Sequence, residues 1–110
     1  MAPMLSHLVH HGHVEPRAYG QRDCLEAGIQ FARTEGIMPA PEATHAIKGA
    51  VDEALKCKAE GKSKSILFNL CGHGHFDMQA YMDYFSGELA EDSFDAKAFE
   101  ESLSAIPAVN

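Results

Sequence analysis

Apolar positions recur at helical spacing in two central parts of the chain. Leu25, Ile29 and Ala32 predict a helix over 21–34, and Gly36 follows where a helix usually ends. A stronger pattern runs from Pro41 to Glu60, with proline at the first helical position, where its missing N–H is tolerated. One face of this second helix is apolar: Ala43, Ile47, Ala50, Val51, Ala54 and Leu55. The opposite face is charged: Lys48, Asp52, Glu53, Lys56 and Lys58.

Three shorter helices are predicted outside this central pair. The first covers 4–11, and Gly12 ends it. Asp77 is placed to cap a second, which carries Tyr81, Tyr84 and Phe85 and which Gly87 ends. A last helix begins at Asp92 or Ser93 and carries a set of apolar residues: Phe94, Ala98, Phe99 and Leu103.

The remaining apolar segments are predicted to be strands. The run 66–68 has no polar alternation, which is typical of a strand buried on both faces of a parallel sheet. A short buried strand is expected at 37–38, and an edge strand limited by Pro16 at 14–19. Helices that alternate with short apolar strands predict the α/β class, with a short parallel sheet of about three strands flanked by helices.

Composition excludes several classes of function. The net charge of −7 disfavours a nucleic-acid partner, which needs a basic face, and no apolar run approaches the length of a membrane span. No signal peptide is recognised at the N-terminus. The three cysteines are odd in number and widely spaced, so a disulfide framework is not expected and a reducing cytoplasm is favoured.

The glycine-rich turn 71–74 lies where the predicted strand meets a helix. Ligands bind at the carboxyl ends of parallel strands, and glycine lets the backbone approach them closely. The same glycines are equally compatible with a tight structural turn. The turn lacks the third glycine of a dinucleotide fingerprint and the Gly-Lys-Ser/Thr ending of a phosphate-binding loop.

Seven histidines in so short a chain raise the possibility of a metal site. His7 and His11 share a helical face, but no third ligand is obvious, so polar surface histidines are the favoured interpretation. A Cys–His nucleophile pair, formed by Cys71 with His73 or His75, lacks an ordering third group and is disfavoured. No metal-ligating or catalytic residue is therefore predicted.

Two segments, 34–47 (TEGIMPAPEATHAI) and 66–77 (ILFNLCGHGHFD), together resemble the C-terminal part of the tryptophan synthase beta chain, most closely its second type. The resemblance covers 1–89, while 90–110 forms a helical tail without a recognised counterpart. It implies a partial piece of the large domain of a fold-type II enzyme that uses pyridoxal phosphate. It also implies that residues on the ring side of the cofactor come from this chain: Glu35, Cys71, Gly72, His73 and Gly74.

The resemblance also indicates what this chain lacks. The family's Schiff-base lysine lies in a His-Lys pair and its phosphate loop is of the Gly-Gly-Gly-Ser-Asn type, and neither pattern occurs here. Cys71 stands where the family has serine. The chain is expected to need the missing N-terminal part of the enzyme, to bind no cofactor alone and to self-associate. The alternative is a small stand-alone α/β binding or assembly module, with a metal bound through its histidines.

Overall fold

The computed structural model of the chain describes residues 2–89 and residue 97. The helices are α1 (Pro3–His10), α2 (Gln21–Glu35), α3 (Pro41–Ala59) and α4 (Met78–Ser86), with a 3₁₀ turn at Gly74–Phe76 before α4. Their bounds agree closely with the helices predicted over the same part of the chain. The predicted last helix, at 92–103, lies outside the described residues.

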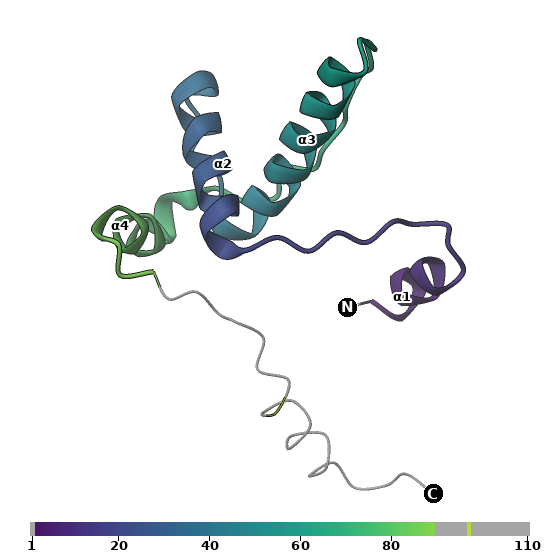
Figure 1. Ribbon diagram of the computed structural model, residues 1–110. Helices are drawn as coiled ribbons and strands as arrows, with labels where there is room; N and C mark the ends of the chain where they lie inside the picture. Colours follow the sequence, from purple (N-terminus) through teal and green to yellow (C-terminus); the bar gives the residue numbers. More distant parts are fainter. Residues whose placement is uncertain (1, 90–96, 98–110) are drawn as a thin grey trace, which may run out of the picture.

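Helices α2 and α3 form the centre of the molecule. They lie close together at their N-terminal ends and diverge toward their C-terminal ends (Figure 1). At Gly28 of α2 a Cβ atom would lie 2.5 Å from Cγ2 of Thr44 on α3, so the absence of a side chain permits this approach. Thr44 is fully buried and donates its hydroxyl hydrogen bond to the carbonyl of Pro41 within its own helix. A small residue on one helix therefore sets the spacing of the pair.

Local signals explain where the helices begin and end. Proline occupies the first turn of α3, as predicted. Gly36 and Gly87 follow α2 and α4 with φ angles of 71° and 76°, the left-handed conformation that glycine adopts without strain. The start of α3 and the ends of α2 and α4 are therefore set by residues within one helical turn of each boundary.

The hydrophobic core is small, and buried apolar residues of α3 belong to it: Ala43, Ile47 and Cys57. One cluster lies between α2 and α4, where Leu25, Ile29 and Tyr81 pack together and three partly buried residues pack against them: Met38, Tyr84 and Leu89. Helix α1 contributes no buried residue and lies apart from α2–α4, joined to them by the extended segment 14–20 (Figure 1).

The predicted parallel sheet is wrong: the described residues contain helices and one isolated bridge but no strand. The segments 14–19, 37–38 and 66–68 have no hydrogen-bonded neighbour strand, and a strand exists only when its backbone groups pair with another. The one bridge, between Pro39 and His73, is antiparallel. An apolar run alone therefore did not reveal whether 66–68 has a strand to pair with.

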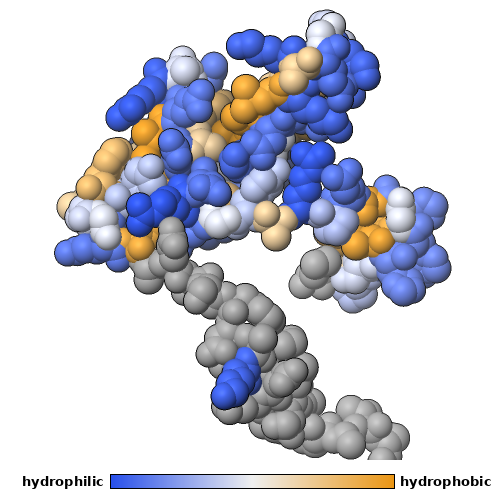
Figure 2. All heavy atoms as spheres, viewed as in Figure 1, coloured by the Kyte–Doolittle hydropathy of each residue, from blue (hydrophilic) through white to orange (hydrophobic). Residues whose placement is uncertain are grey.

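Expected burial also fails at several positions. Leu67, predicted to lie in a strand covered on both faces, is 99% exposed, whereas Phe68 is half-buried and its ring meets that of Phe31 edge-on at 5.8 Å. Ile37 and Leu55, also expected to be buried, are exposed. Apolar side chains consequently reach the surface along α3 and on α1 (Figure 2).

Candidate functional site

The turn 71–74 is held against the segment 38–40 by the isolated bridge. The amide of Ala40 donates to the carbonyl of Gly72 at 3.2 Å, and the amide of Gly74 donates to the carbonyl of Met38 at 2.9 Å. These two hydrogen bonds flank the pair Pro39 and His73. The two sequence segments that carry the family resemblance therefore lie side by side.

Both glycines of the turn are required by this backbone contact. Gly72 has a φ of 89°, and a Cβ atom on it would lie 3.2 Å from Cβ of Ala40. A Cβ atom on Gly74 would lie 2.5 Å from the carbonyl oxygen of Pro39 and 3.2 Å from the ring of Tyr81. A side chain at Gly74 would force the two segments apart, since one of the atoms it meets is backbone.

Tyr81 of α4 packs against the bridge and hydrogen-bonds to it. The sequence analysis did not predict this role. Its hydroxyl donates a 2.6 Å hydrogen bond to the carbonyl of Pro39, and its side chain is 1% exposed. Burial, and next the negative charge of Asp77, raise the pKa of Tyr81 above its ordinary value. The sequence predicted Tyr81 on a helix, but no spacing pattern links it to a carbonyl far away along the chain.

The polar groups of the turn are open to solvent. Cys71 is an exposed free thiol, and His73 and His75 are exposed with ring centroids 4.9 Å apart. The amide of His75 donates to Nδ1 of His73 at 3.3 Å. Four of the five predicted cofactor residues are thus contiguous on one turn. The fifth, Glu35, is the exposed last residue of α2 and has no hydrogen bond to this turn.

Three lysines of the chain form ion pairs away from the glycine turn. Lys48 binds Asp52 at 2.7 Å, and this hydrogen bond lowers the pKa of Asp52. Lys62 pairs with Glu60 at 2.9 Å and Lys64 with Glu53 at 3.8 Å. None of these ion pairs involves a residue of the glycine turn.

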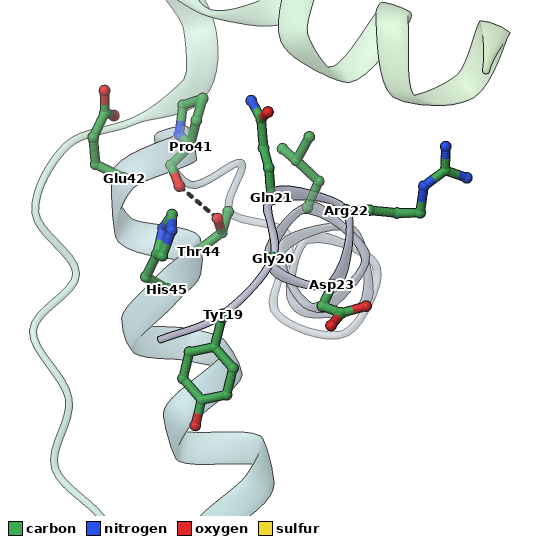
Figure 3. A pocket seen from close by; sticks show the side chains of 10 residues that line it. Tyr19, Gly20, Gln21, Arg22, Asp23, Pro41, Glu42, Thr44 and His45 are labelled. Carbon is green, nitrogen blue, oxygen red and sulfur yellow. Dashed lines mark hydrogen bonds between the residues drawn. The ribbon is translucent and has the colours of Figure 1, made fainter. Parts of the chain in front are cut away.

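A separate open pocket of about 690 Å³ lies where the N-terminal ends of α2 and α3 meet (Figure 3). Its lining includes Tyr19, Arg22, Asp23, Thr44 and His45. None of the predicted cofactor residues lines it. The pocket and the glycine turn are therefore distinct features of the chain.

The histidines do not gather with other potential ligands into a group of three or more in the part of the chain that the structure describes. No group of three or more histidine, cysteine, aspartate or glutamate side chains has suitable geometry there. His7 and His11 do share a helical face, as predicted, with ring centroids 4.2 Å apart. Over the same residues, no helix is long and apolar enough to cross a membrane.

The described residues form a small helical unit with a glycine turn, an exposed thiol and several exposed apolar side chains. Sequence comparison shows which proteins the chain is similar to. The chain is 58% identical over 88 residues to tryptophan synthase beta chain 2 of Methanosarcina mazei, a match that covers 80% of this chain and 20% of the relative.

Other relatives agree. The chain is 56% identical over 90 residues to tryptophan synthase beta chain 2 of Aquifex aeolicus and 54% identical over 91 residues to that of Thermococcus kodakarensis. These matches cover 82% and 83% of this chain and 21% of each relative. No protein-family model matches the chain. Most of the chain is homologous to the C-terminal part of the tryptophan synthase beta chain and spans about one fifth of that protein's length, which confirms the resemblance.

Proposed function

We propose that this chain supplies the cofactor-ring side of the active site in a tryptophan synthase beta-like enzyme of the cytoplasm. The reaction is the β-replacement that joins serine and indole to give tryptophan, and pyridoxal phosphate is the cofactor. The bridge between Pro39 and His73 carries the proposal, because it fixes the turn 71–74 with its thiol exposed. The partner is the N-terminal part of the enzyme, which would bring the lysine and the phosphate loop.

The chemistry of the turn fits the ring side of this cofactor. Pyridoxal phosphate, when bound, supplies an electron sink for bond cleavage next to the amino-acid carbon. Cys71 would offer a neutral hydrogen-bond donor to the pyridine nitrogen, which a thiol provides more weakly than a hydroxyl. A neutral donor would leave that nitrogen unprotonated and so would favour β-replacement over transamination. Gly72 and Gly74 hold the backbone of the turn in place.

The chain alone is expected to make no tryptophan, since neither the lysine nor the phosphate loop of the family occurs in its sequence. Purified chain mixed with pyridoxal phosphate should lack the visible absorption band of a cofactor bound to one specific lysine. A saturable, stoichiometric band at a single lysine would contradict this part of the proposal.

A chimera tests the proposed function directly. Residues 1–89 of this chain would replace the matching segment of the Methanosarcina mazei beta chain, and tryptophan formation from serine and indole would be measured. We expect an active enzyme. A Gly74→Val version should lose activity, because its side chain would collide with the carbonyl of Pro39.

Variants at Cys71 examine the role of the neutral donor. In the chimera, Cys71→Ser should keep most of the activity, whereas Cys71→Asp should protonate the ring nitrogen and divert the chemistry. A chimera that folds and binds pyridoxal phosphate but forms no tryptophan would overturn the proposal. Equal activity of the serine and aspartate versions would refute the assigned contact.

A further inference from the structure

Histidine is concentrated at one end of the chain, outside the proposed cofactor site. Four of the seven histidines fall within residues 7–13, and the four side chains are exposed: His7, His10, His11 and His13. Helix α1, which carries the first of them, buries none of its residues. These imidazoles contribute nothing to the core, so the packing of the fold does not account for them.

The end of α1 brings three of these rings close together. The ring centroids of His7 and His11 are 4.2 Å apart, and those of His10 and His11 are 5.3 Å apart. The amide of His11 donates to the carbonyl of His7 at 3.0 Å, which keeps the two residues one helical turn apart. Amides of the next two residues close the turn by bonding to Val9 and Leu8 at 3.0 and 2.9 Å. The backbone therefore fixes the separation of His7 and His11.

We propose that His7 and His11 form a two-ligand site for a divalent transition-metal cation such as Ni²⁺, Cu²⁺ or Zn²⁺. Imidazole nitrogen suits these metals, and residues four apart on a helix present their side chains to the same side. Both rings are exposed, so water completes the coordination. Helix α1 has no lysine, arginine, aspartate or glutamate, and the chain's net charge of −7 attracts cations.

Metal binding at this pair has a structural consequence for α1. An isolated helix of eight residues is marginal in water, and α1 has no buried residue to stabilise it. A metal that binds both rings only when the helix is formed shifts the equilibrium toward the helix. The metal therefore raises the helical content of the chain as it binds.

The test uses the full chain without an affinity tag, in a Cys71→Ser background so that the exposed thiol does not compete for metal. Calorimetric titration with Ni²⁺ should give one ion per chain, and far-ultraviolet circular dichroism should show a gain in helix. His7→Ala or His11→Ala should each weaken binding roughly 100-fold, because the second contact is intramolecular. His45→Ala, which removes a single exposed histidine from α3, serves as the control.

Three outcomes would overturn the assignment. One is a His7→Ala variant that binds Ni²⁺ as tightly as the parent chain. Another is loss of binding on substitution of His73 or His75, which would move the site to the glycine turn. Metal-induced helix that persists in the His11→Ala variant would equally contradict the proposal.

Discussion

The Tyr81 hydroxyl donates a buried 2.6 Å hydrogen bond to the carbonyl of Pro39, 42 residues away in the sequence. This contact joins α4 to the segment that carries the antiparallel bridge. The position of the candidate site therefore depends on Tyr81. This residue lies outside both of the segments, 34–47 and 66–77, that meet at the bridge.

Tyr81→Phe should destabilise the chain by about 1–3 kcal/mol, because it leaves the Pro39 carbonyl buried without its donor. Urea denaturation followed by circular dichroism measures the change. Tyr84→Phe, at a half-buried tyrosine on the same helix, is the control and should change stability little. Equal effects of the two substitutions would mean that the hydrogen bond does not stabilise the fold.

Alkaline pH should weaken the fold through the same tyrosine. Burial, followed by Asp77, raises the pKa of Tyr81 above its ordinary value of 10.0. The unfolded chain therefore loses this proton first, so the contribution of Tyr81 is fully present below pH 10 and declines as the pH rises through the folded-state pKa. Stability measured from pH 8 to about 11 should fall less steeply in Tyr81→Phe than in the parent chain. Identical slopes would contradict the prediction.

Two glycine substitutions test the packing of α2 against α3. Gly28→Ala should destabilise the chain by about 1–3 kcal/mol, since its Cβ atom would lie 2.5 Å from Thr44. Gly49→Ala on α3 should be neutral or stabilise by about 1 kcal/mol, because its Cβ atom would meet only Tyr19 at 3.9 Å and alanine favours helix. Thermal melts of both variants decide the matter. A Gly28→Ala protein as stable as the parent chain would show that α2 and α3 can move apart without loss of stability.

Self-association is expected of the full chain in solution. Leu67, Phe76, Met82 and Phe85 are exposed, and the extended segment around Leu67 leaves backbone groups that can pair with another chain. Light scattering over a range of micromolar concentrations should reveal a symmetric dimer. Leu67→Lys should weaken it without loss of stability, since this side chain is 99% exposed. A stable monomer would favour the stand-alone module over a segment of a larger enzyme.

The sequence predicted the helices well because their signals are local. Pro41 marks the start of α3, and Gly36 and Gly87 mark the ends of α2 and α4. The sheet was predicted wrongly because pairing is not local: the run 66–68 has strand-forming residues but no partner strand in the described part of the chain. An apolar run indicates that a segment favours burial, but it does not indicate which part of the chain would bury it.

The candidate site was predicted in part. The resemblance located the turn 71–74, and the structure adds the backbone contacts that explain its glycines. Tyr81 could not be assigned to the site, because its contact with Pro39 is defined only when α4 folds back on the earlier segment. The pocket at the start of α2 and α3 escaped prediction for the same reason, since its lining comes from two separate stretches.

The bridge between Pro39 and His73 joins the two ends of the chain segment that contains α3, so this segment forms a closed loop. The far end of that loop follows the C-terminal end of α3, where residues 58–61 are exposed, and α3 leads away from the bridge (Figure 1). Lengthening a loop whose ends are already joined adds little entropic cost. Extra residues inserted beside Gly61 should therefore leave the turn 71–74 undisturbed, which makes this tip a suitable place to attach a fluorescent reporter or a flexible tether.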